Sequence, residues 1–198
     1  MAAESVNHGR RRFLTASTVV VGGVGGIFAA VPFLSAWKPN AKAVAAGAPV
    51  TADISKLAVG QQMTVAWRGR PIFIVRRSPE MLSALPSEDS RLRDPQSSVE
   101  DQQPSFAKNG HRSLKPELLV LVGSCTHLGC SPKLHTEVKP EPWDSQWKGG
   151  YYCPCHNSRF DLAGRVYEGS PAPTNLVVPP YRFDGDTKVI IGESEGAA

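Results

Sequence analysis

Four cysteines and two histidines, gathered in two short segments, constrain this chain more than any other feature of its sequence. The first segment reads CTHLGC and begins at Cys125, with His127 two residues later. The second reads CPCH and runs from Cys153 to His156. Thiols and imidazoles at such short spacing are typical metal ligands, so each segment can offer one of each to a shared site. A polar stretch, residues 131–150, separates the two segments.

Three interpretations of these six residues compete. Structural disulfides would use the cysteines but leave His127 and His156 unexplained. A zinc site with two Cys and two His would leave Cys130 and Cys155 unexplained. In addition, the two Cys of a zinc finger usually lie close together in the sequence. A two-iron, two-sulfide cluster with two Cys on one iron and two His on the other accounts for all six, since the remaining cysteines can bridge the segments. The sequence favours this third interpretation.

The N-terminal region has the features of an export signal that also anchors the chain in a membrane. Three arginines at positions 10–12 precede Phe-Leu, as in twin-arginine signals. The 25 residues from Phe13 to Trp37 carry no charge. As a helix they would extend about 37 Å, more than the roughly 30 Å of a hydrocarbon core. We predict a cytoplasmic leader over 1–12, an uncleaved transmembrane anchor over 13–37 and a flexible or partly helical hinge over 38–50.

The net charge of +4 would by itself suggest a nucleic-acid or membrane-surface protein. It arises entirely within residues 1–50, where Arg10, Arg11, Arg12, Lys38 and Lys42 face the single acid Glu4. Residues 51–198 are therefore neutral. A neutral globular part has no basic field to attract phosphates, so we expect no nucleic-acid partner.

Short apolar or alternating runs in residues 51–198 predict strands over 62–67, 71–76, 118–122 and 188–191. Turn residues predict two hairpins, one joining the first two runs and one joining 181–183 to 188–191. The polar region 79–115 predicts loops, with a short helix at 79–85. Because 17 Pro and 18 Gly accompany these strands and no strand–helix–strand alternation is visible, the pattern predicts an all-β fold.

The two segments and the GRVYEGSPAPTNL that follows them resemble the Rieske iron–sulfur subunits of quinol–cytochrome c oxidoreductases, the cytochrome bc complexes. The resemblance covers the whole chain, from the twin-arginine leader to the segments. It implies a Rieske-type antiparallel β-sandwich over 51–198, with an inserted cluster-binding subdomain at about 123–175. It also implies one N-terminal transmembrane helix and one [2Fe–2S] cluster.

The resemblance further implies a role for individual residues. The expected cluster ligands are Cys125, His127, Cys153 and His156, and the expected disulfide joins Cys130 to Cys155. His156 is expected to hydrogen-bond the quinol and accept its proton, with His127 as the other exposed ligand. The residues expected around the cluster are Leu128, Ser158, Phe160 and Pro171. Since Phe160 lacks the hydroxyl that many relatives carry as Tyr, we predict a lower reduction potential than in those relatives.

The implied partners are a cytochrome b subunit with a quinol site and a c-type cytochrome, in a dimer of complexes. The implied location is the bacterial inner membrane, with a cytoplasmic N-terminus and a periplasmic Rieske domain. The hinge at 38–50 would let this domain move between its partners. Two alternatives remain open: the Rieske subunit of another exported oxidase, such as arsenite oxidase, and a zinc-stabilised module without redox function.

Overall fold

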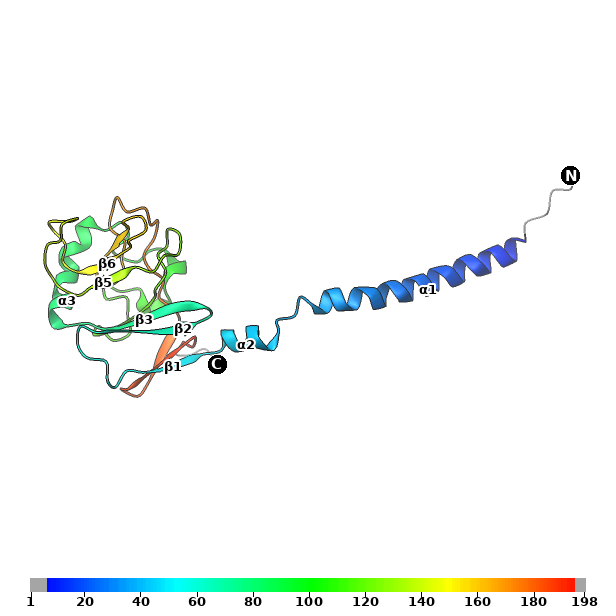
Figure 1. The fold of residues 1–198 in the computed structure, drawn as a ribbon, viewed down its shortest axis with the longest axis horizontal. Coiled ribbons are helices and arrows are strands. Elements are labelled where there is room, and N and C mark those ends of the chain that lie inside the picture. Colours follow the sequence, from blue (N-terminus) through cyan, green and yellow to red (C-terminus); the bar gives the residue numbers. More distant parts are fainter. Residues whose placement is uncertain (1–6, 195–198) are drawn as a thin grey trace. The chain divides into compact units, whose positions relative to one another are not determined.

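The computed structural model describes residues 7–194, which form two units that divide after Ala45. Helix α1 (His8–Ser35) makes up most of the first unit (Figure 1). Asn7 caps it, since its side-chain oxygen accepts a hydrogen bond from the Arg10 amide at 3.1 Å. None of its residues is buried within the chain. Among residues 7–194, α1 alone is long and apolar enough to cross a membrane.

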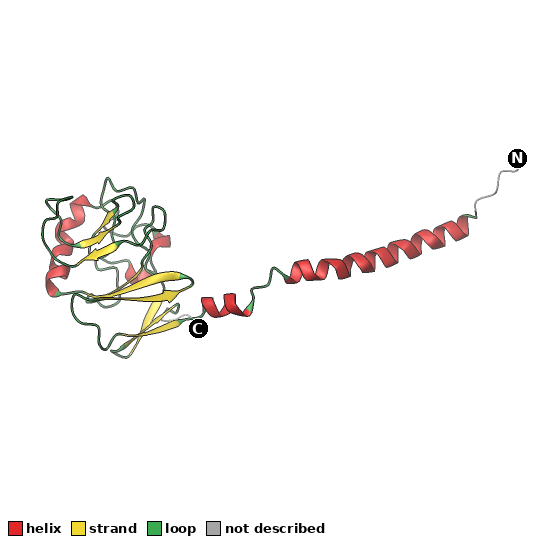
Figure 2. Ribbon diagram, viewed as in Figure 1, coloured by secondary structure: helices red, strands yellow, loops and turns green. Residues whose placement is uncertain are grey.

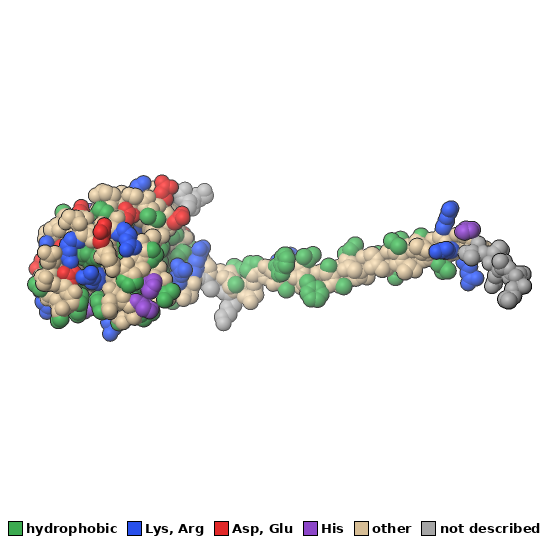
Figure 3. All heavy atoms as spheres, turned by 90° about the horizontal axis from the view of Figure 1, so that it is seen from above, with side chains coloured by type: hydrophobic (Ala, Val, Ile, Leu, Met, Phe, Trp, Pro, Cys, Tyr) green, Lys and Arg blue, Asp and Glu red, His purple; other side chains and the backbone are tan. Residues whose placement is uncertain are grey.

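The bounds of α1 differ from the predicted anchor, residues 13–37. Because of the Asn7 cap, the helix already includes the three arginines, and it ends at Ser35. Figure 3 shows Lys and Arg side chains gathered at the N-terminal end of α1. The helix therefore combines the charged part of the export signal with the apolar run that follows it.

The predicted hinge, residues 38–50, contains a second short helix, α2 (Ala41–Gly47). The Asn40 side chain caps α2 by accepting a hydrogen bond from the Ala43 amide at 2.8 Å. Val50 already belongs to a strand, where it pairs with Ile191. The segment is thus partly helical, and its last residue belongs to β1 (Val50–Asp53).

The second unit contains three antiparallel sheets of three strands each (Figure 2). The strands of the first sheet, in spatial order, are β1 (Val50–Asp53), β9 (Lys188–Ile191) and β8 (Tyr181–Asp184). Those of the second are β2 (Gln62–Trp67), β3 (Arg70–Arg76) and β4 (Leu118–Val122). Those of the third are β5 (Lys133–His135), β6 (Gly150–Tyr152) and β7 (Arg159–Phe160). The predicted all-β fold is confirmed.

The second sheet supplies the centre of the core. Every residue of β4 is buried, and the strand pairs with β3 in a register that joins Val122 to Ile72. A fully apolar strand of this kind fits a position covered on both faces. Beyond β4 the chain passes directly over the Phe73 ring, and only a glycine at position 123 leaves room for it. The first cysteine segment begins two residues later.

Short helices cover the region between β3 and β4. They are α3 (Pro79–Ala84) and three 3-10 turns, η1 (Leu85–Arg91), η2 (Glu100–Gln102) and η3 (Ser105–Ala107). Ser78 caps α3 by accepting a hydrogen bond from the Met81 amide at 3.2 Å. The short helix predicted at 79–85 is confirmed, and the rest of this region is irregular as expected.

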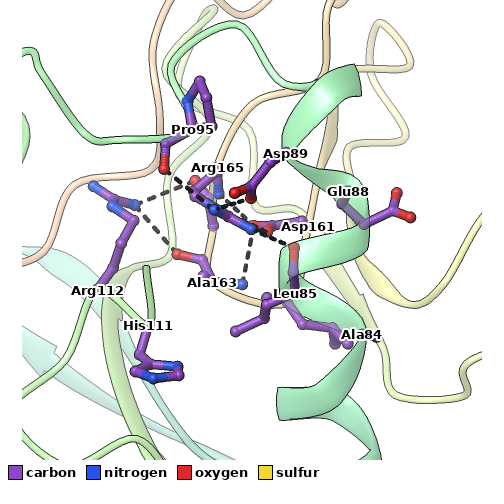
Figure 4. Close-up of polar contacts among 12 residues, drawn as sticks. Ala84, Leu85, Glu88, Asp89, Pro95, His111, Arg112, Asp161, Ala163 and Arg165 are labelled. Atoms are coloured by element: carbon purple, nitrogen blue, oxygen red, sulfur yellow. Dashed lines mark hydrogen bonds and ion pairs between the residues drawn. The ribbon is translucent and has the colours of Figure 1, made fainter. Parts of the chain in front are cut away.

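Buried arginines join this irregular region to the chain that follows the second cysteine segment (Figure 4). The Arg165 guanidinium contacts the Asp161 carboxylate at 2.7 Å and that of Asp89 at 2.7 Å. Arg112 donates to the carbonyls of Ala163 and Gly164, both at 3.3 Å. Burial lowers the pKa of Arg112 to about 10, so it stays charged at neutral pH. These bonds hold residues 161–165 at several points.

Candidate iron–sulfur site

The two cysteine segments fold into loops with the same backbone hydrogen bonds. In the first loop (residues 125–130) the Cys125 amide donates to the Cys130 carbonyl at 2.7 Å, and the Gly129 amide donates back to Cys125 at 2.9 Å. In the second loop (residues 153–158) the Cys153 amide donates to Ser158 at 2.8 Å, and the Asn157 amide donates to Cys153 at 3.0 Å. Both turns therefore present the side chains between their ends in similar positions.

Each loop turns back through one residue in the left-handed region. Gly129 has a φ of 84° in the first loop, and Asn157 has a φ of 61° in the second. Glycine adopts this conformation without steric cost, and Asn is among the few other residues that tolerate it. Asn157 was not among the residues predicted from the sequence, although Asn directly after a CPCH segment is a turn signal.

A disulfide between Cys130 and Cys155 joins the two loops, as the resemblance implied. Their Cα atoms are 6.6 Å apart. The Cys153 sulfur lies within 4.8 Å of both bridged sulfurs. Since bridged sulfurs are not available as thiolate ligands, metal binding in this region depends on the two free cysteines.

These free cysteines, Cys125 and Cys153, are both buried, with 4% and 1% of their surface exposed. Burial raises the pKa of the Cys125 thiol, and hydrogen bonds from the His127 amide and the Ser158 hydroxyl oppose the shift. The nearby Cys153 thiol raises the same pKa further. The site thus brings one thiol from each loop into contact, and binding to iron would deprotonate both.

The two histidines of the segments also meet. The rings of His127 and His156 lie edge to face, with centroids 4.7 Å apart and an angle of 86° between their planes. The Nδ1 atom of His127 is buried and has no hydrogen-bond partner among residues 7–194. A buried imidazole nitrogen without a partner is costly unless it binds a metal. His156 is exposed, so it can reach a molecule outside the domain.

The donor set fits a [2Fe–2S] cluster of the Rieske type. Such a cluster needs two thiolates on one iron and two imidazoles on the other, and each loop supplies one of each. Zinc would find four donors here as well, but a zinc site does not require thiols to pair with thiols and imidazoles with imidazoles, as they do here. The structure therefore pairs the two predicted thiol ligands with each other and the two predicted imidazole ligands with each other.

The remaining predicted residues occupy different positions. Leu128 is 71% exposed at the tip of the first loop, and Phe160 is fully buried in β7. Ser158 is buried, and its hydroxyl accepts a hydrogen bond from the Ala172 amide at 3.1 Å. Pro171 is exposed, and its neighbour Ala172 is buried, so the place of Pro171 beside the cluster stays a prediction.

A further hydrogen bond, which was not predicted, joins the first ligand loop to the chain that follows the proline-containing loop (residues 170–173). The Thr126 hydroxyl donates to the Thr174 carbonyl at 2.7 Å, which fastens the first loop to the chain after Pro173. Sequence reasoning could not find this bond, because 48 residues separate its two ends. Together with the bond from Ala172 to Ser158, it places the proline-containing loop against both ligand loops.

Comparison with known proteins gives consistent matches. The family model of the Rieske [2Fe-2S] domain matches residues 48–182, and that of the "Ubiquitinol-cytochrome C reductase Fe-S subunit TAT signal" matches residues 1–40. The ubiquinol-cytochrome c reductase iron-sulfur subunit of Allochromatium vinosum is 56% identical over 198 residues, 100% of this chain and 95% of that protein. The mitochondrial Rieske subunit of the Schizosaccharomyces pombe cytochrome b-c1 complex is 42% identical over 81% of this chain and 60% of that protein.

Among solved structures, a chain of a hyperthermophilic respiratory Complex III matches with a TM-score of 0.46 and 22% identity, covering 88% of this chain and 98% of that chain. The signal match and the apolar helix α1 fit a subunit anchored in a membrane. The domain match and the sequence identity over the full length identify the family and its cofactor. The chain belongs to the Rieske [2Fe–2S] proteins and, among these, to the iron–sulfur subunits of ubiquinol–cytochrome c reductase.

Proposed function

We propose that this chain takes electrons from quinol and passes them to a c-type cytochrome, as one subunit of a quinol–cytochrome c oxidoreductase. One observation carries the proposal: two buried free thiols, one from each loop, interact with each other, and two imidazoles, one from each loop and one of them exposed, pack ring against ring. When bound, a cluster with two neutral imidazole ligands exchanges one electron at a higher potential than an all-thiolate cluster.

Four residues would hold the cluster: Cys125, Cys153, His127 and His156. The buried, unpartnered Nδ1 of His127 is the nitrogen that would bind iron, which leaves Nε2 as the nitrogen available to the outside. His156 is more exposed than His127 and is our candidate for the quinol contact. It would accept a hydrogen bond from the quinol hydroxyl at Nε2 and then take up its proton there.

The surface beside His156 suits a docked quinol site. Leu128 presents 71% of its surface to the outside, and an exposed Leu at the tip of a loop offers an apolar contact. A partner that covered Leu128 and His156 would exclude water from the hydrogen bond between imidazole and quinol. The partner we propose is the cytochrome b subunit, and the name of the S. pombe relative, a cytochrome b-c1 subunit, supports this.

The proposed arrangement in the membrane has a cytoplasmic leader (1–12), a transmembrane anchor (13–37), a hinge (38–50) and a periplasmic Rieske domain (51–198) within which residues 123–175 form the cluster-binding part. Basic side chains at the N-terminal end of α1 support a cytoplasmic N-terminus in the bacterial inner membrane. The complex would be a dimer, as in the family that the chain resembles. Small residues in the hinge support movement of the domain between partners.

The spectrum of the purified full-length protein tests the proposal. After reduction with dithionite, we expect a visible and EPR signal from a [2Fe–2S] cluster with imidazole ligands, with two irons per chain. A protein that contained zinc and no iron would overturn the proposal. Co-purification with a b-type haem would support the proposed partner, and an iron-loaded protein that associates with a molybdenum enzyme would replace it.

The hinge has its own test in the assembled complex. Replacing residues 45–48 by a run of prolines should slow turnover, because a stiff extended segment restricts movement of the domain. The cluster spectrum should stay unchanged. Unchanged turnover would show that the domain does not need to move.

A further inference from the structure

The insertion (residues 131–150) forms an aromatic cluster beside the second ligand loop. Trp143 stacks on Tyr152 of β6, with ring centroids 4.6 Å apart and an angle of 29° between the planes. His135 of β5 lies edge to face against Trp143 at 5.2 Å. Trp147 is buried and packs against Tyr167 at 5.7 Å, which joins the cluster to the rest of the domain. The Tyr152 ring is therefore held on the Trp143 ring.

Tyr152 links this aromatic cluster to the second loop. Its hydroxyl donates to the Asn157 side-chain oxygen at 2.5 Å. Asn157 follows His156 directly and is the residue at which the loop turns through positive φ. Because an Asn side chain in this conformation is otherwise free to rotate, the hydrogen bond fixes both the side chain and the turn beside His156.

A second tie holds the other side of the same loop. The Asp144 carboxylate of the insertion accepts from the Arg159 guanidinium at 2.9 Å and from that of Arg91 at 2.5 Å. Arg159 follows Ser158, the last residue of the loop. The Asp144 side chain is only 6% exposed, so this ion pair is shielded from water more than a surface pair is.

We infer that the insertion is a brace for the second ligand loop, and that Tyr152 and Asn157 are positioning residues that fix His156. The inference rests on the proposed function, since His156 matters as a ligand and quinol contact only there. The first loop turns at Gly129, which has no side chain to hold, so the brace serves the loop that carries the more exposed histidine. An imidazole that is fixed in this way has one orientation toward quinol, so its side chain loses no conformational entropy when quinol binds.

Hydrogen exchange in the cluster-loaded full-length protein tests the inference. In Tyr152→Phe the ring can still stack on Trp143, and in Asn157→Gly the turn can still form, but both lose the same hydrogen bond. We expect amides of residues 153–158 to exchange about five-fold faster in either variant, the effect of one lost hydrogen bond. The double variant should show little more than the larger single effect, because there is only one bond to lose. The EPR lines of the reduced protein should broaden in both variants.

Matched controls separate a local brace from general stability. Asn157→Asp keeps an acceptor oxygen and tolerates positive φ, so it should exchange close to the wild-type rate. Tyr181→Phe removes a hydroxyl that accepts from the Leu114 amide at 2.9 Å, in a different sheet, and should leave residues 153–158 unchanged.

Three results would overturn the inference: wild-type exchange in both single variants, additive effects in the double variant, or equal acceleration in Tyr181→Phe. A different result would contradict the proposed function: a wild-type protein that holds no iron–sulfur cluster. The two failures are distinguishable, because the wild-type spectrum decides the function and the variants decide the brace.

Discussion

The two ligand loops share one backbone turn but differ in what holds it. In the first loop, Thr126 is the residue whose side chain forms a hydrogen bond within the described part of the chain. The second loop is held through Asn157 and Ser158, and through Arg159 just beyond it. A disulfide is the covalent link between the two.

The two loops therefore depend on different interactions for their conformation. The first loop has an exposed Leu128 at its tip and depends on the disulfide and one threonine, whereas the second depends on several side-chain hydrogen bonds. Side-chain hydrogen bonds specify orientation, whereas a disulfide mainly limits the unfolded chain. We therefore expect the loops to respond alike to loss of a ligand and differently to loss of support.

The largest expected effect should be equal in the two loops. Cys125→Ser and Cys153→Ser each remove one of the two thiolates that a Rieske cluster needs, so both variants should lose the cluster completely. Iron content and the EPR spectrum of the reduced protein measure this. A variant of either loop that kept two irons would show that its cysteine is not a ligand.

The chain after the second loop gives the next largest effect. Asp161→Ala leaves the Arg165 guanidinium, 2% exposed, without its closest buried carboxylate, which should lower the free energy of unfolding by about 3–5 kcal/mol. Denaturant unfolding measures the loss. Asp186→Ala is the control, because its partner Lys115 lies in an exposed pair and its removal should have almost no effect. Equal losses would mean that burial of the Arg165 pair is unimportant.

Loss of the disulfide should separate the two loops. The cysteines are 25 residues apart, so Cys130→Ala with Cys155→Ala should lower the free energy of unfolding by about 3 kcal/mol. Hydrogen exchange should rise more in residues 125–130 than in 153–158, since the second loop keeps its side-chain contacts. A larger rise in the second loop would reverse the comparison.

Removal of a single hydroxyl should change the midpoint potential of the cluster without unfolding the domain. The Ser158 hydroxyl lies near the Cys125 thiol of the other loop and acts against the rise in its pKa. Ser158→Ala removes a donor that favours the reduced, more negative cluster, so the midpoint potential should fall by about 60 mV, the equivalent of 1.4 kcal/mol for one electron. Redox titration followed by EPR gives the midpoint, and an unchanged value would contradict a role for Ser158 in setting it.

The smallest expected effect has the opposite sign. Phe160→Tyr adds a hydroxyl close to the ligand loops, and a donor to a ligand sulfur should raise the midpoint potential. Phe160 is fully buried, so part of the gain is offset by fitting the hydroxyl into a packed site. We expect the rise to be smaller than the fall in Ser158→Ala. A midpoint that did not rise would contradict the prediction.

Local patterns were enough to predict much of the fold. The strands β2, β3 and β4 carry four or more apolar or alternating residues in sequence, so their hydrophobic pattern is readable. The strands β1, β5, β6 and β7 have only two to four residues each. Such short strands form because a partner lies beside them, and the partner is set by the whole chain.

The chemistry of this protein follows from its residue types alone, because residue type decides which atoms can bind iron and which stretch is apolar enough for a membrane. Two Cys–His segments and an uncharged run of 25 residues were sufficient for that. Which atoms are buried, which are unpaired and which loop is braced depends on how the folded chain packs. The unpaired Nδ1 of His127 and the bond between Tyr152 and Asn157 depend on neighbours that packing brings together, and no residue type specifies these in advance.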